Sequence, residues 1–186
     1  MELLEESFPK DIDQLIRKCE EAILLVKEKL ADKNCPYIKD LYLLERGHRQ
    51  KDFLRKLNIQ CNSFLNKNNL IKNEVKGLYV FASESIEGNW EPIYLGISRT
   101  VFRRLYQHVW GKKHNEATLA FIMAKQRLLH VEKRNTLLIS ELIKEQAFIK
   151  NLKLVIVPEE NDYALYFMEV YMAGRLKSKW NSFRTH

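Results

Sequence analysis

The first regular pattern in the chain is a series of apolar residues at helical spacing between residues 10 and 30. The apolar positions are Ile12, Leu15, Ile16, Cys19, Ala22, Ile23, Val26 and Leu30. Charged side chains lie on the other face, which is typical of an amphipathic helix. Residues 31–36 interrupt the pattern, and a second helical stretch, itself interrupted near Gly47, is expected over about residues 38–65. We therefore expect residues 1–75 to form a helical attachment.

The pattern changes at Lys76 to short runs of β-branched and aromatic residues. The runs at 77–83 (GLYVFAS) and 92–97 (PIYLGI) are separated by a polar segment that contains Gly88 and Asn89. Two such runs around a polar turn predict a β-hairpin with a long loop. The apolar run at 152–157 predicts a third strand.

Helical spacing returns after the hairpin. We expect Ser98 to cap a helix whose apolar stripe contains Phe102, Leu105, Tyr106 and Val109. Residues 117–151 predict one or two further helices with a break near residues 133–135. The last helix is expected over residues 163–176, and a basic aromatic tail follows it.

Together these elements predict an α+β fold, a small antiparallel three-stranded sheet flanked by helices. The main domain would span residues 76–186, with residues 117–151 as a helical insert. Only 6 glycines and 4 prolines among 186 residues disfavour a turn-rich all-β fold.

The basic residues are distributed unevenly along the chain. Residues 1–75 carry 14 basic and 13 acidic side chains, whereas residues 76–186 carry 17 and 11. Almost all of the formal net charge of +7 therefore lies in the C-terminal part. This distribution fits a surface that binds nucleic acid, and it fits a merely soluble basic surface equally well.

The cysteines and the N-terminus bear on the compartment. Cys19, Cys35 and Cys61 form no Cys-x-x-Cys pair, so we expect free thiols in a reducing environment. The N-terminus is acidic where a secretory signal would be basic, and no apolar run reaches the roughly 18 residues of a membrane span. The sequence thus predicts a cytoplasmic protein without a membrane partner.

Two tripeptides mark the predicted hairpin as a candidate site. Gly77-Leu78-Tyr79 begins one strand, and Tyr94-Leu95-Gly96 lies near the end of the next. Either tripeptide alone is ordinary strand packing, in which the tyrosine is a half-buried cross-strand residue. The pair on one hairpin, followed directly by a basic helix, resembles the GIY-YIG nuclease family over about residues 76–186.

The basic helix contains Arg104 and His108, four positions apart and therefore on one helix face. The resemblance implies an arginine here, and some restriction enzymes of the family have this Arg-x-x-x-His spacing. The spacing selects Arg104 over the adjacent Arg103. The alternative is an ordinary solvated face of a basic helix.

Glu169 stands out in the last helix, because no other charged residue lies between Asp162 and Arg175. A lone carboxylate on an apolar stripe is costly unless something pairs with it. A structural Lys or Arg partner is one solution. The resemblance implies another, a single divalent cation bound by Glu169. The resemblance also implies a site role for Asn181.

The resemblance implies a metal-dependent DNA endonuclease of restriction type or stand-alone type, with one Mg²⁺ or Mn²⁺ per active site. Tyr79 would take a proton from water, either as a phenolate or by relay through His108, and Tyr94 would position the water or the phosphate. Arg104 can donate two hydrogen bonds to phosphate oxygens. With one carboxylate, a two-metal mechanism is disfavoured.

Three other functions compete with a restriction-type or stand-alone nuclease. The first is a DNA-repair nuclease. The second is a catalytically silent nucleic-acid-binding module that uses the tail aromatics Trp180 and Phe183 for stacking. The third is a protein-interaction role for the helical residues 1–75, which is compatible with the restriction-type or stand-alone nuclease.

Overall fold

The structure, a computed structural model, describes residues 11–43, 48–50, 52–59, 62–66, 69–113, 115–128, 139–181 and 183. Along the chain the elements are α1 (Ile12–Ala31), α2 (Ile38–Leu41), β1 (Tyr42–Leu43), β2 (His48–Arg49), α3 (Phe53–Leu57), β3 (Asn62–Asn66), β4 (Asn69–Glu74), β5 (Gly77–Glu84), β6 (Trp90–Ser98), α4 (Val101–Trp110), α5 (Thr118–Leu128), α6 (Ile139–Ile149), β7 (Lys153–Pro158) and α7 (Asp162–Arg175).

The centre of the fold is an antiparallel three-stranded sheet in the order β6-β5-β7. This confirms the predicted α+β architecture of a small sheet flanked by helices. The central strand β5 is buried along residues 77–82, which explains its nearly continuous apolar sequence. Tyr79 lies opposite Gly96 on β6 and opposite Ile156 on β7.

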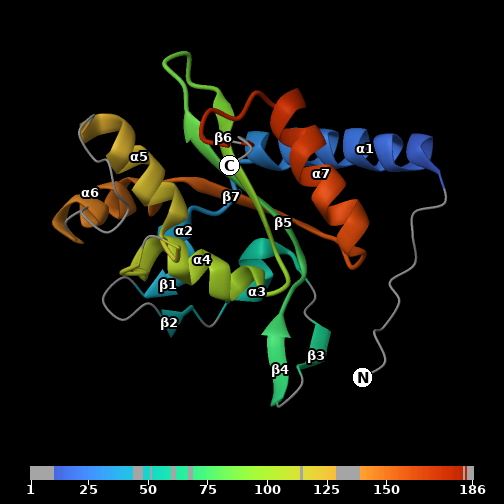
Figure 1. The fold of residues 1–186 in the computed structure, drawn as a ribbon, viewed down its shortest axis with the longest axis horizontal. Coiled ribbons are helices and arrows are strands. Elements are labelled where there is room, and N and C mark those ends of the chain that lie inside the picture. The colour runs from blue at the N-terminus through green and yellow to red at the C-terminus, as the bar shows by residue number, and fades with distance from the viewer. Residues whose placement is uncertain are drawn as a thin grey trace.

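Helices cover both faces of the sheet (Figure 1). On one face α1 and α7 pack over Leu78 and Val80. On the other face α4, α5 and the short N-terminal elements enclose Tyr79 and Phe81. Alternate residues of β5 thus enter different apolar clusters, as the two-residue period of a strand requires. The helix predicted over residues 10–30 is confirmed as α1, and it is part of the same core as the sheet.

The helix predicted over residues 38–65 is wrong. Where the structure describes this region, it contains two short helices, the paired strands β1 and β2, and the first strand of the β3–β4 pair. The interruption predicted near Gly47 lies outside the described residues. Tertiary contacts explain the difference, because Ile38, Leu41, Tyr42 and Phe53 are all buried in the cluster under the sheet. The Ile38 amide donates to the carbonyl of Leu152, and the Tyr42 hydroxyl donates to the carbonyl of Phe102.

The other predicted elements agree with the structure. The strands at 77–83, 92–97 and 152–157 are β5, β6 and β7, and the helix at 163–176 is α7. Residues 117–151 form α5 and α6, although the break near residues 133–135 lies outside the described residues.

The start of α4 differs from the prediction, because Ser98 is not its cap. The N-cap residue is Thr100, whose side chain makes no capping bond. Glu74, at the end of β4 and far from α4 in sequence, caps the helix instead. Its buried carboxylate accepts hydrogen bonds from the amides of Phe102 and Arg103, at 3.0 and 3.1 Å. A negative charge at a helix N-terminus also interacts favourably with the helix dipole.

Two further findings concern membrane-spanning helices and the cysteines. Of the helices in the described ranges, none is both long and apolar enough to cross a bilayer. Cys19 and Cys35 are free and buried, as expected for reduced thiols, and Cys61 lies outside the described residues.

Replacing Glu74 by alanine should destabilise the protein by about 1–3 kcal/mol, because the buried amide of Phe102 and the partly buried amide of Arg103 lose a charged acceptor. The measurement is chemical denaturation of the variant beside the matched control Glu84→Ala, at the exposed end of β5. Equal stability of the two variants would contradict the capping role of Glu74.

Candidate functional site

A hydrogen bond between two buried side chains forms the centre of the candidate site. The Tyr79 hydroxyl lies 2.8 Å from Nε2 of His108. Tyr79 comes from the central strand and His108 from α4, and both side chains are almost completely buried. The bond satisfies a phenol hydroxyl that would otherwise be unpaired in the core.

Gly96 creates the space for this phenol. A Cβ atom at position 96 would lie 2.3 Å from the Tyr79 hydroxyl oxygen. This distance is too short for any residue other than glycine unless Tyr79 moves. Gly77 is also required, since a Cβ there would lie 2.4 Å from the carbonyl oxygen of Val157. Close packing therefore explains the glycine in each tripeptide, and at Gly96 the close contact is with the site residue Tyr79.

Tyr94 lies beside Tyr79 on the same face of the sheet. The two ring centroids are 6.3 Å apart, and Tyr94 is also 5.5 Å from the His108 ring. Burial raises the pKa of both phenols, the carboxylate of Glu169 raises it further, and the charge of Arg104 lowers it. Burial dominates, so both hydroxyls are protonated at neutral pH.

His108 is neutral as well. Burial, and secondarily the nearby Arg104 charge, holds its pKa well below the usual value of 6.5. Its other nitrogen, Nδ1, is buried and has no hydrogen-bond partner among the described residues. The Tyr79–His108 pair is thus an uncharged phenol and imidazole joined by one hydrogen bond.

Arg104 is held by four oxygens, none of which belongs to a carboxylate. Nη1 donates to the Gln107 side chain and to the carbonyls of Asn115 and Glu116, and Nη2 donates to the Thr118 hydroxyl at 2.7 Å. Within the described part of the chain it has no ion-pair partner. The guanidinium is therefore fixed in place with its positive charge uncompensated, as a site for an anion requires.

Glu169 supplies the opposite charge from α7, on the other side of the sheet. It makes no hydrogen bond or ion pair with any residue that the structure describes, and burial raises its pKa. The structural Lys or Arg partner considered above is thus not found there. Its charge acts on both site tyrosines, so its carboxylate lies within electrostatic reach of their hydroxyls.

A half-buried carboxylate without a partner fits a hard divalent cation, which prefers oxygen ligands. Across the described residues, no three His, Cys, Asp or Glu side chains cluster as a metal site. A cation bound by Glu169 would therefore take its remaining ligands from water or substrate.

Asn181 is placed differently from the other predicted residues. Its amide pairs with the main chain of Leu95, accepting from the nitrogen and donating to the oxygen, both at 2.8 Å. The Ser178 hydroxyl also donates to its side-chain oxygen. Because Leu95 lies between Tyr94 and Gly96, this contact fixes the strand that carries two site residues. The geometry supports a positioning role for Asn181.

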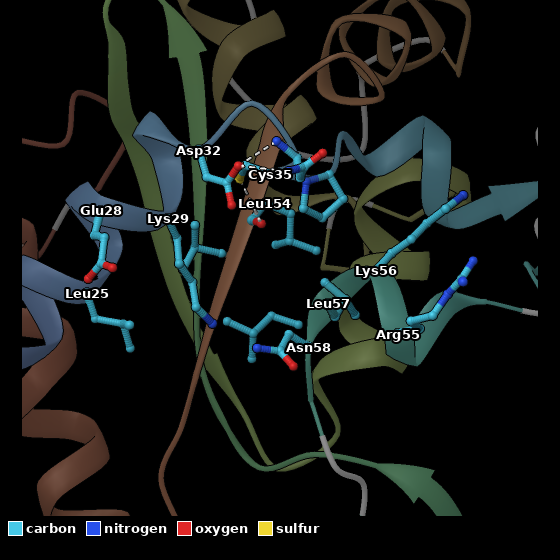
Figure 2. Close-up of a pocket in the computed structure, with 14 residues that line it drawn as sticks. Leu25, Glu28, Lys29, Asp32, Cys35, Arg55, Lys56, Leu57, Asn58 and Leu154 are labelled. Atoms are coloured by element: carbon cyan, nitrogen blue, oxygen red, sulfur yellow. Dashed lines mark hydrogen bonds between the residues drawn. The ribbon is translucent and has the colours of Figure 1, made fainter.

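A hollow of about 470 Å³ lies elsewhere, at the outer edge of β7. Figure 2 shows it between the end of α1, with Glu28 and Lys29, and α3, with Arg55 and Lys56. None of the predicted site residues lines it, so the candidate site remains the cluster around Tyr79.

Replacing Gly96 by alanine should destabilise the protein by about 1–3 kcal/mol, because the new methyl group displaces the Tyr79 hydroxyl. Gly174 is the matched control, since a Cβ there meets nothing within 4 Å and its exposed helical position favours alanine by about 0.5 kcal/mol. Thermal melts of both variants are the measurement. A Gly96→Ala variant as stable as Gly174→Ala would contradict the close approach.

We compared the chain with known proteins. No family model, no curated protein and no solved structure matches it. What the protein does is therefore inferred from its own residues.

Proposed function

We propose that this protein is a metal-dependent DNA endonuclease of GIY-YIG type that hydrolyses phosphodiester bonds. The observation that carries the proposal is the Tyr79–His108 hydrogen bond, within electrostatic reach of the Arg104 guanidinium and of the Glu169 carboxylate, neither of which has an ion-pair partner among the described residues. Ordinary packing has no need for Arg104 and Glu169 to remain unpaired beside buried tyrosines.

Arg104 would bind the scissile phosphate. Its four hydrogen bonds to neutral oxygens hold the guanidinium before the substrate arrives, so little reorganisation accompanies binding. A planar guanidinium suits two phosphate oxygens, including the charge that develops on them in the transition state.

Glu169 would hold one Mg²⁺ or Mn²⁺. When bound, such an ion stabilises negative charge on the phosphate and the leaving oxygen. Glu169 fits this role because its charge is unneutralised by the described residues and already disfavoured by burial. The positive charge of a cation removes that cost.

The proton from the attacking water would pass through Tyr79 to His108. A phenolate intermediate is unfavourable, since burial and the Glu169 charge both raise the pKa of Tyr79. The relay avoids it, because the water proton joins the Tyr79 oxygen while the Tyr79 proton moves to Nε2 of His108. The incoming phosphodiester carries a negative charge, which favours the imidazolium that this transfer produces.

Replacing Glu169 by glutamine should lower metal-dependent cleavage at least about 100-fold, because the cation loses its protein ligand. Burial raises the folded-state pKa of Glu169, so its charge costs stability at neutral pH, and the melting temperature should be equal or higher.

The measurement is nicking of supercoiled plasmid with Mg²⁺, with Mn²⁺ and with a chelator. The matched control is Glu87→Gln, in the exposed β5–β6 loop, which should cut like the wild type. Unchanged cleavage by Glu169→Gln would refute the metal ligand, and a sharp fall in its melting temperature would show that Glu169 is a structural ion-pair partner.

The pH profile tests whether His108 is neutral in the free enzyme. Since His108 is neutral far below its usual range, kcat/KM should stay flat between about pH 6 and about pH 8, without the limb near 6.5 of an exposed histidine. A limb centred near 6.5 would contradict the buried, neutral histidine.

Tyr79→Phe should lower the rate about 100-fold to about 10,000-fold, because the ring stays and only the hydroxyl of the relay is lost. Tyr171→Phe is the matched control, since the Tyr171 hydroxyl also makes one side-chain hydrogen bond, to Glu20 at 2.6 Å. Full activity of Tyr79→Phe would leave this tyrosine a packing residue.

A further inference from the structure

A second concave surface lies on the outer side of α4, beside the candidate active site. It is a hollow of about 430 Å³ lined by Arg103, Tyr106, Gln107, Trp110, Gly111, Lys112, Lys113 and Glu116. On the helix, His108 is buried and Arg104 is half-buried, whereas Arg103 and Tyr106 are exposed to solvent. We call this surface the α4 pocket.

The α4 pocket contains an aromatic platform. Tyr106 stacks on Trp110 with ring centroids 5.3 Å apart and planes inclined by 19°. Trp110 also packs edge-to-face with Tyr42 and makes a cation–π contact with the Lys150 ammonium, which lies 5.4 Å from the indole centroid. Tyr106 is the outermost member of this stack and is 42% exposed. Its ring is therefore a supported, accessible surface for another planar group.

The pocket is also positively charged. The side chains of Arg103, Lys112 and Lys113 are exposed, and with the described residues they form no ion pair. The single lining carboxylate, Glu116, is engaged by the amides of Lys112 and Lys113 at 3.2 and 3.4 Å. Three cations around an aromatic platform match a ligand that combines anionic groups with a planar ring.

The pocket is connected to the candidate active site by two residues. Gln107 and Glu116 line the pocket, and both also provide oxygens that hold Arg104. The α4 pocket therefore adjoins Arg104, the proposed phosphate ligand.

We propose that the α4 pocket binds an unpaired nucleotide of the nucleic-acid substrate, with its base stacked on Tyr106 and its phosphates on Arg103, Lys112 and Lys113. A base inside a duplex has both faces covered by its neighbours, so only a single-stranded or extruded nucleotide can stack there. The inference rests on the proposed function in that both take nucleic acid, and it specifies substrates with an unpaired nucleotide beside the cut.

Binding of a labelled short oligothymidylate, in chelator to prevent cleavage, tests the stacking contact by fluorescence anisotropy. Tyr106→Leu still covers Trp110 but removes the aromatic face, so affinity should fall at least about five-fold. Tyr106→Phe should bind like the wild type. The matched control Phe148→Leu, at an aromatic residue of α6 that is also 42% exposed, should bind like the wild type too.

An abasic oligonucleotide with the same phosphates is the matched control ligand. Tyr106→Leu should not change its affinity, whereas Arg103→Gln should lower the salt dependence of binding for both ligands by about 0.7 in the log–log slope. Lys125→Gln, outside the pocket, should leave that slope unchanged.

An unchanged affinity of Tyr106→Leu for oligothymidylate, or an equal loss with the abasic ligand, would overturn the proposal and leave a general polyanion surface. Plasmid nicking separates this result from the proposed function. Nicking without Tyr106-dependent binding refutes the pocket alone, and Tyr106-dependent binding without nicking refutes the nuclease alone.

Discussion

A phenol hydroxyl buried in an apolar core must have a hydrogen-bond partner, and the candidate site is built around this requirement. The partner of Tyr79 is His108, which places α4 against the sheet face at a fixed distance. The hydroxyl also needs room, which limits position 96 to glycine. The Glu74 carboxylate holds the start of the same helix, so Arg104, Tyr79 and His108 are kept in one arrangement by the core itself.

The parts of the fold that could be predicted are those with a clear local sequence pattern. The strands around Tyr79 and Tyr94 are short runs of β-branched and aromatic residues, and α1 and α7 have apolar residues at helical spacing. The secondary structure of residues 38–74 could not be predicted, because the elements described there are short and depend on contacts with residues far away in the sequence. One such contact is the hydrogen bond from Ile38 to Leu152. Local propensity carries little information in such a region.

The residues of the candidate site could be predicted from the sequence, but the hydrogen bonds that hold them in place could not. Glycine beside tyrosine on a hairpin, the four-residue spacing of Arg104 and His108, and the isolated carboxylate of Glu169 are visible in the sequence. The capping carboxylate of Glu74 and the Thr118 hydroxyl that holds Arg104 are not, because both are brought near only by the fold. The pairing of Asn181 with a strand likewise depends on where the tail runs.

The pairing of the chain tail with β6 has a consequence for self-association. A sheet of three strands exposes two edges, and open edges invite other strands to pair with them. At the β6 edge, Trp180 and Asn181 form hydrogen bonds with the main chain of Ile93 and Leu95. At the β7 edge, Pro36 accepts a hydrogen bond from the Leu154 amide, and Tyr37 forms a β-bridge with Lys153. Non-repetitive segments thus cover part of both edges, which protects a small apolar sheet against edge-to-edge aggregation at high protein concentration.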